Sequence, residues 1–216
     1  IPDGGFRLTG EGAVGMQLGI GSFSASAGVR GLASGGVAKD LMELVLLGNE
    51  RGREYSLHGT DLGVAVFGDT AVGVSLPVGN VRLGARYHQL LGLAYMYITG
   101  DGKLYIPYDP QDVRGDFSLE YGFSDFETDR LAVQGEGSAF DVGVAWQVTP
   151  GVSVGAAVFD IGQLQWDNVM SQSCKVAADA GAFDPDADLN ELGDCSDETI
   201  GSKVWQLPRR YEASVG

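Results

Sequence analysis

Apolar and polar residues alternate through residues 138–162, SAFDVGVAWQVTPGVSVGAAVFDIG. Between 140 and 146, and again between 152 and 158, every second position holds Phe, Val, Trp or Ala. The positions between them hold Gly, Ala, Ser or Asp. This period of two predicts two β-strands, and a tight turn at 148–150 would join them with Trp146 opposite Val152. One face of the hairpin is then apolar and the other is small or polar.

The small, polar face distinguishes two classes of β-protein. The exposed face of a soluble antiparallel sheet usually carries Lys, Glu, Thr and Arg. In a transmembrane β-barrel the apolar face meets lipid and the opposite face lines a lumen. From this hairpin alone, a membrane barrel and a Gly-rich soluble β-domain both stay open.

The N-terminal region repeats the pattern in residues 11–20 and 23–29. A two-residue turn at Gly21-Ser22 keeps the apolar positions of both strands on one face, with Ile20 opposite Phe23. Gly at the first central position suits a type II′ turn. We therefore predict a second hairpin of the same kind.

The longest predicted hairpin surrounds a turn at Gly79-Asn80, with strands over 61–78 and 81–97. Residues 68–70 are either a further turn or a bend within one strand, and the similar lengths of the two runs favour the bend. Such strands exceed the roughly ten residues that cross a membrane and should project beyond it. The register predicted from this turn pairs Leu76 with Leu83, Val72 with Tyr87, and Leu62 with Tyr97.

The remaining elements complete a count of about nine strands. A turn at 100–102 precedes a short strand over 103–108, and further strands cover 113–123 and 204–215, the last of them broken near Pro208. Residues 37–47 are rich in Leu, Met and Glu and precede Gly48, which predicts a short helix. This helix either covers the lumen or packs on the rim of the sheet.

The predicted tight turns fall at one end of the sheet, and the long connections (31–60, 124–137 and 163–203) fall at the other. Outer-membrane barrels of bacteria have this arrangement, with the long loops outside the cell. The sequence thus predicts an all-β, antiparallel, up-and-down transmembrane β-barrel with one short loop helix.

Composition narrows the class of partner. The 216 residues carry 34 Gly and a net charge of −15, which argues against a nucleic-acid partner because that binding needs clustered Lys and Arg. The sequence contains no run of 18 apolar residues, so it does not predict a transmembrane helix. The chain starts without a signal peptide and ends just after a strand, so we expect residues 1–216 to be one β-barrel domain of which part is absent.

Two cysteines, Cys174 and Cys195, lie in a polar region that no core would bury. A disulfide formed in an oxidising compartment is the natural interpretation, and two free thiols are the alternative. The bond would close an extracellular loop at about 163–203.

Several segments together resemble the FadL/PorV-like outer-membrane proteins. These are KDLMELVLLGN, VGVSLPVGNVRLGARYHQLLGLAY, FDVGVAWQVTPGVSVGAAVFDIGQLQW and LPRRYEASVG, and the similarity spans roughly residues 37–216. The resemblance implies a barrel of about fourteen strands in the bacterial outer membrane. It also implies either passage of small hydrophobic molecules or a non-transporting role as a structural or docking subunit of a secretion or cell-surface assembly. The partners would be membrane lipid and either a hydrophobic small molecule or a partner protein.

No catalytic constellation is visible. The GxSxG, HExxH and P-loop motifs do not occur, so we expect neither an enzyme nor a cofactor. Polar side chains on the small-residue face would line the lumen, where they either gate it or pair simply because a lumen is polar. These candidates are Arg82, Arg86, His88, Arg114, Asp116, Glu120 and Asp141.

Asp184, Asp186 and Asp188 have the spacing of the start of a calcium loop. Leu189 and Cys195 stand where such a loop needs Gly and Glu, so a solvated acidic loop is the main alternative. Three hypotheses remain from the sequence: a barrel that passes small hydrophobic molecules, a non-transporting structural or docking barrel, and a soluble secreted β-protein.

Overall fold

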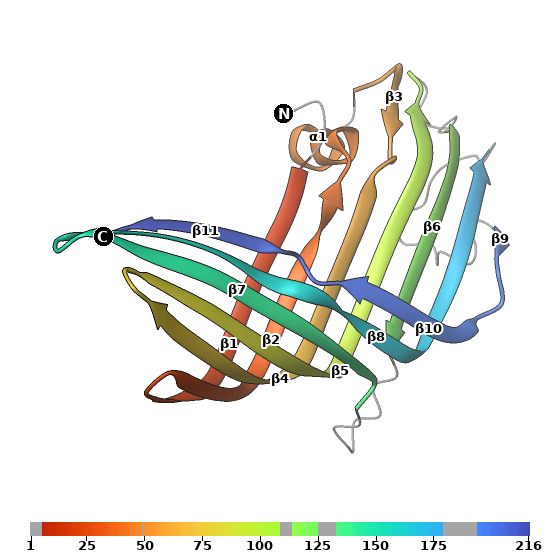
Figure 1. Cartoon of the computed structure of the whole chain (residues 1–216). Coiled ribbons are helices and arrows are strands. Elements are labelled where there is room, and N and C mark those ends of the chain that lie inside the picture. Colours follow the sequence, from red (N-terminus) through yellow and green to blue (C-terminus); the bar gives the residue numbers. More distant parts are fainter. Residues whose placement is uncertain (1–5, 49, 109–113, 125–132, 179–193) are drawn as a thin grey trace.

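The computed structural model describes residues 6–48, 50–108, 114–124, 133–178 and 194–216. In these ranges the chain forms one antiparallel sheet of 11 strands and one helix (Figure 1). The predicted all-β antiparallel fold with a short helix is confirmed. The elements are β1 (Phe6–Ile20), β2 (Phe23–Val37), α1 (Lys39–Leu47), β3 (Arg53–Ser56), β4 (Thr60–Val78), β5 (Val81–Ile106), β6 (Arg114–Ser124), β7 (Gly135–Thr149), β8 (Val152–Ala178), β9 (Asp194–Cys195), β10 (Thr199–Gln206) and β11 (Arg210–Val215).

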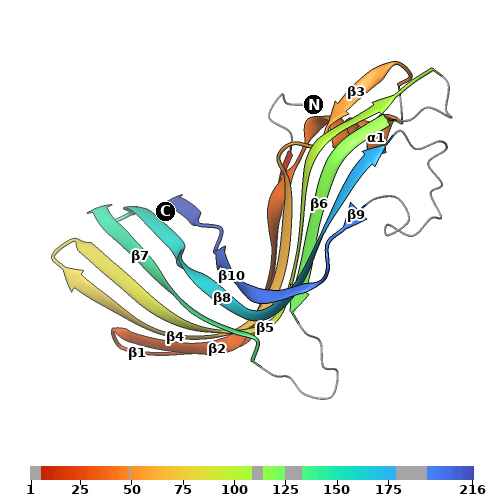
Figure 2. The same cartoon turned by 90° about the vertical axis from the view of Figure 1, so that its right-hand side faces the viewer.

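Strands β5 and β8 are the longest and run through two halves of a bent sheet (Figure 2). The near half ends at the tight turns, and there β7 lies between β5 and β8. In the far half β6 takes the same place between them. β1, β2 and β4 continue the sheet on the β5 side, and β9, β10 and β11 pair with β8 on the other.

Three β-bulges accompany the bend. In β5 the register against β4 shifts at Gly92 to Ala94, with Leu93 as the extra residue. In β8 the extra residues fall around Asp160 and Asn168, which have φ of 60° and 53°. A bulge bends its strand and increases the local twist, so the bend follows from these insertions.

The registers predicted around the tight turns are largely confirmed. Leu76 pairs with Leu83, and Val72 pairs with Tyr87. Ile20 pairs with Phe23 across the predicted Gly21-Ser22 turn. β4 is one continuous strand, as the bend interpretation of residues 68–70 predicted.

Two predicted registers were wrong, one because of a bulge and the other because of the position of a turn. Tyr97 pairs with Gly63 instead of Leu62, since Leu93 reverses the faces of the rest of β5. Trp146 pairs with Val154 instead of Val152 because the turn lies at Pro150-Gly151, where Thr149 pairs with Val152, and one register shift follows between Gln147 and Thr149. This second error is two residues long and leaves both side chains on the predicted face.

The predicted turn at 100–102 was also wrong. β5 runs on to Ile106, and Gly102 has a φ of 117° within the strand. A Cβ at Gly102 would lie 2.3 Å from the carbonyl oxygen of Asp116, so glycine is required there by close approach to the next strand.

The count of about nine strands and the predicted loops need correction. Two short strands, β3 and β9, lie in segments expected to be loops, and Pro208 separates β10 from β11. β6 ends and β7 begins at the bend instead of at the far rim (Figure 2). Of the expected 163–203 loop, β8 covers residues up to Ala178 and β10 begins at Thr199.

The expected disulfide between Cys174 and Cys195 is present. The two residues are register partners, so the bond fastens β9 to β8. In the part of the chain that the structure describes, no helix has the length and apolar character needed to cross a membrane.

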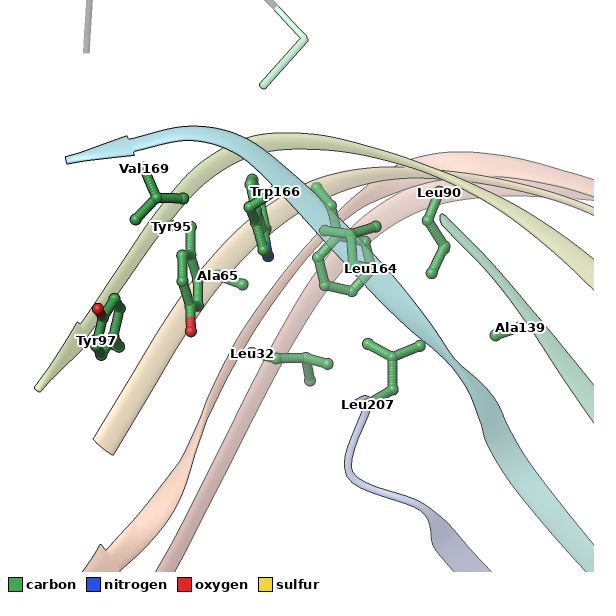
Figure 3. Packing of buried hydrophobic residues seen from close by; sticks show 11 residues of the cluster. Leu32, Ala65, Leu90, Tyr95, Tyr97, Ala139, Leu164, Trp166, Val169 and Leu207 are labelled. Atoms are coloured by element: carbon green, nitrogen blue, oxygen red, sulfur yellow. The ribbon is translucent and has the colours of Figure 1, made fainter. Parts of the chain in front are cut away.

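The buried apolar residues gather on the concave face at the bend (Figure 3). Trp166 of β8 is fully buried and stacks on Tyr95 of β5, with ring centroids 5.1 Å apart. A Cβ at Gly92 would lie 2.5 Å from the Trp166 ring, so glycine there makes room for the indole. The cluster consists of Leu32, Ala65, Phe67, Leu90, Tyr95, Tyr97, Ala139, Leu164, Trp166, Val169 and Leu207.

Candidate functional site

Charged side chains cross the concave face of the sheet beside this apolar cluster. They come from strands that are distant in sequence, and salt bridges and hydrogen bonds connect them into one group. We call this group the ion-pair belt; it consists of Glu11, Arg30, Asp69, His88, Asp141, Asp160 and Arg210.

Arg30 of β2 is the centre of the belt. Its guanidinium donates to both carboxylate oxygens of Asp160 at 2.8 and 3.1 Å, to Asp69 at 3.2 Å and to Glu11 at 3.0 Å. Its apolar neighbour is the Phe67 ring, 5.5 Å from the guanidinium carbon. A guanidinium has five N–H donors in a fixed plane, which suits it to several carboxylates at once.

His88 of β5 continues the belt. Its Nδ1 lies 2.8 Å from Asp69 and its Nε2 lies 2.9 Å from Asp141. An ionised carboxylate only accepts hydrogen bonds, so both ring nitrogens must carry protons and the imidazole is cationic. Asp69 therefore lies between two cations, Arg30 and His88.

Asp160 owes its position to the β8 bulge. Its positive φ is uncommon for a residue other than glycine. Its backbone N–H donates to the Asp141 carboxylate at 3.0 Å, and its own carboxylate is buried against Arg30. Such local strain persists where surrounding contacts determine the conformation, and it is frequent at functional sites.

The belt reaches across the hollow of the sheet. Arg30 and Asp160 lie on β2 and β8, with β4, β5 and β7 between them. At about 4.8 Å per strand spacing, this path along the sheet is about 19 Å. Because their side chains meet at 2.8 Å, the sheet must curl tightly around the belt.

A second ion pair joins the two edges of the near half. Arg210 of β11 donates to Glu11 of β1 at 2.6 Å. In the described ranges the backbones of β1 and β11 do not pair with each other, so the sheet is not closed by hydrogen bonds. The side chains alone link these edges.

Two cavities lie on opposite sides of the belt. The turn cavity, of about 390 Å³, faces the tight turns and is lined by Phe23, Ser75, Arg86, Asp141, Ala157 and Phe159, among others. The far cavity, of about 520 Å³, lies between β10 and the far parts of β1, β2, β4 and β5. The belt and the apolar cluster therefore separate two spaces within the concave face.

The structure brings together only part of the predicted lumen set. His88 and Asp141 contact each other within the belt, and Arg86 pairs in register with Asp141 and lines the turn cavity. Arg82 is exposed nearer the turns, opposite Ala145.

The β6 candidates lie apart from the belt. Glu120 accepts hydrogen bonds from Tyr97 at 2.6 Å and Lys203 at 3.4 Å. Asp116 is exposed opposite Lys103, and Arg114 is the register partner of Tyr105. The calcium candidates Asp184, Asp186 and Asp188 lie outside the described residues. Within the described ranges, no group of three or more His, Cys, Asp or Glu side chains is arranged to hold a metal ion.

Most residues of the belt were not predicted from the sequence. Arg30 shares the parity of Ser24 and Ser26, so the strand phase alone could have placed it on the inner face. Asp69 was assigned to a bend, although it has the same parity as Gly73. The face on which Asp160 lies could not be predicted, because it is determined by the β8 bulge and the alternation does not reveal that bulge.

The fold and the belt together define an antiparallel β-sheet protein with a charged concave face. A family model, described as a family of unknown function (DUF5723), matches residues 8–202. The chain therefore belongs to this family. No curated protein and no solved structure matches the chain.

The belt predicts a large and specific effect on stability. Arg30→Met would leave the buried carboxylates of Asp69 and Asp160 without their shared cation, at a cost of about 3–5 kcal/mol in the free energy of unfolding. Arg82→Met, at an exposed position of β5 on the same face of the sheet, should change that free energy little. Denaturant unfolding in detergent micelles checks both variants, and equal effects of the two would contradict the central role of Arg30.

Proposed function

We propose that this chain forms part of the wall of a bacterial outer-membrane β-barrel. The observation that carries the proposal is an inverted distribution of polarity. Large apolar side chains of the near half are exposed, with Ile20 84% and Val72 60% accessible, whereas Asp160 and His88 on the other face are 4% and 5% accessible. An apolar exterior around a polar interior is what a lipid environment favours.

The apolar exterior is continuous across the strands of the near half. Exposed apolar residues occur on β1, β2, β4, β5, β7 and β8 in the same alternating phase. Leaving this much apolar surface in water would be unfavourable, at about 25 cal/mol per Å². The exposed apolar residues include Val14, Met16, Leu18, Ile20, Phe23, Val72, Leu76, Leu83, Tyr87, Phe140, Val142, Val144, Trp146 and Val152.

The two edges of the sheet fit the same proposal. In lipid, every backbone N–H and C=O needs a partner, so sheet edges must be paired. Pairing of the free edges of β1 and β11 with further strands would complete a larger barrel, in keeping with the roughly fourteen strands that the FadL/PorV resemblance implies. The tight turns would face the periplasm and the far half would face the outside of the cell.

Within such a barrel we favour a structural or docking role in a secretion or cell-surface assembly. The reason is that the belt and the apolar cluster occupy the space between the two cavities. Arg30 spans this space to Asp160, and Trp166 and Leu207 are buried beside it. A barrel with a filled interior can still bind a partner protein at its rims without passing any molecule through.

Passage of small hydrophobic molecules is the second candidate, and the turn cavity favours it. Its lining includes the inward-facing Ala157 and Phe159, and it lies at the end of the sheet that carries the tight turns. A molecule entering there would meet Arg86 and the belt, so onward passage would require the ion pairs of Arg30 to separate.

The membrane assignment makes a prediction about two adjacent positions on β7. Val144→Arg places a charge on the proposed lipid face and should reduce barrel stability by about 2–4 kcal/mol near the membrane midplane. Ala145→Ser, on the inner face, should have almost no effect. Folding assays in lipid vesicles measure both. If Val144→Arg folds and inserts like the parent, Val144 does not face lipid and the assignment of the two faces is wrong.

The filled interior makes a prediction about transport. Vesicles that contain the full-length protein should take up a small apolar dye no faster than protein-free vesicles. The variant Arg30→Ala, if it still inserts, is the informative comparison because it removes the cation that spans the interior. Faster uptake with the parent protein would contradict the non-transporting role and support passage.

A further inference from the structure

The far cavity has a lining that neither the belt nor the proposed barrel wall explains. Its volume of about 520 Å³ lies within the range of small-molecule sites, roughly 300–1,000 Å³. Every residue that lines it belongs to the described part of the chain. The lining consists of Arg7, Thr9, Ser34, Gly35, Gly36, Asp61, Gly63, Tyr95, Tyr97, Thr99, Lys203, Val204, Trp205, Gln206 and Pro208.

The hydroxyl of a largely buried tyrosine lies at the wall of this space. The Tyr95 side chain extends from β5 into the interior, with its oxygen at the far end (Figure 3). Tyr95 is 3% accessible and stacks on Trp166, which fixes its ring. Its backbone N–H is bonded to Ser124, but within the described ranges no hydrogen bond is made by its hydroxyl. The hydroxyl oxygen is not enclosed by protein atoms, so it is available to a molecule in the cavity.

Two opposite charges on the wall are also unused. Arg7 of β1 and Asp61 of β4 both line the cavity and are exposed, and neither forms an ion pair or side-chain hydrogen bond with the rest of the described chain. Lys203, by contrast, is paired with Glu120 and lies over the Tyr97 ring. The unused groups amount to one guanidinium and one carboxylate, so the cavity does not favour a strongly charged ligand of either sign.

The remaining wall combines hydroxyl groups with an indole. Thr9, Ser34 and Thr99 contribute hydroxyls, and Trp205 of β10 contributes an aromatic surface. A Cβ at Gly63 would lie 3.5 Å from the Trp205 Nε1, so the absence of a side chain there leaves room beside the indole.

We propose that the far cavity is a binding site for a saccharide of one or two pyranose rings. The hydroxyls of such a ring both donate and accept, so they match Asp61, Arg7 and the Tyr95 hydroxyl together. The apolar C–H face of the ring matches the indole of Trp205. A purely hydrophobic molecule would displace water from the Tyr95 hydroxyl and both charges without replacing the lost hydrogen bonds, which is unfavourable. This inference does not rest on the membrane proposal, because the cavity lies on the concave face in either environment.

The test is calorimetric titration of the full-length protein with maltose, cellobiose and N,N′-diacetylchitobiose. At least one should bind saturably. Tyr95→Phe removes only the hydroxyl and retains the ring that packs on Trp166, so it should fold normally and weaken binding about tenfold, or about 1.4 kcal/mol. Asp61→Asn should weaken binding to a similar degree.

Asp101→Asn is the matched control, because Asp101 is an exposed carboxylate paired with His58 outside the cavity. This variant should bind the same sugar as tightly as the parent protein does. Absence of binding to all three disaccharides would overturn the proposal. Sugar binding that Tyr95→Phe and Asp61→Asn leave unchanged would overturn it too, as would saturable binding of an apolar dye that competes for these residues while the sugars do not.

Discussion

The contact between Arg30 and Asp160 determines the shape of this sheet. It joins strands that are separated by three others, so it can form only if the sheet curls around it. It depends in turn on the bulge that gives Asp160 a positive φ and turns its carboxylate toward the interior. Burying an ion pair is costly unless further hydrogen bonds satisfy both partners. Asp69 and Glu11 accept such further hydrogen bonds from Arg30.

The polarity of the two faces follows from the same geometry. A concave face with a tight curl has room for few large side chains, and Gly, Ala and Ser fill most of it in the near half. The large apolar residues are left for the convex face, where they are exposed. Where the concave face does hold large rings, at the bend, glycine stands opposite them: Gly92 and Gly135 make room for Trp166. A sheet of this kind is a poor soluble domain and a good membrane wall, which is why we favour the barrel proposal.

The sequence was informative where alternation is uninterrupted. The pairing around Gly79-Asn80 and Gly21-Ser22 followed from turn chemistry and phase, and the phase placed His88 and Asp141 on one face. The interruptions were not predictable, because a bulge adds one residue without changing the composition. Because the alternation does not reveal Leu93 as the extra residue, the predicted register placed Tyr97 on the wrong face.

The belt was harder to predict than the strands. Arg30, Asp69 and Asp160 are far apart in sequence, and their contact depends on how tightly the whole sheet curls. Alternation assigns a face to a residue but gives no curvature. The far cavity could not be predicted for the same reason, since β10 comes to face β1 and β2 across that cavity only through the bend in β8.

The central claim, that the convex face meets lipid, is tested most directly by Trp146. This residue lies on the exposed apolar face of β7, whereas Trp166 is buried within the concave face. The measurement is tryptophan fluorescence of the full-length protein in vesicles of brominated and unbrominated phosphatidylcholine. The fluorescence of the Trp146→Phe variant is subtracted, so that the difference reports on Trp146. The account predicts that bromine in the acyl chains strongly quenches this signal while aqueous iodide does not. Quenching by iodide and not by the brominated lipid would contradict it.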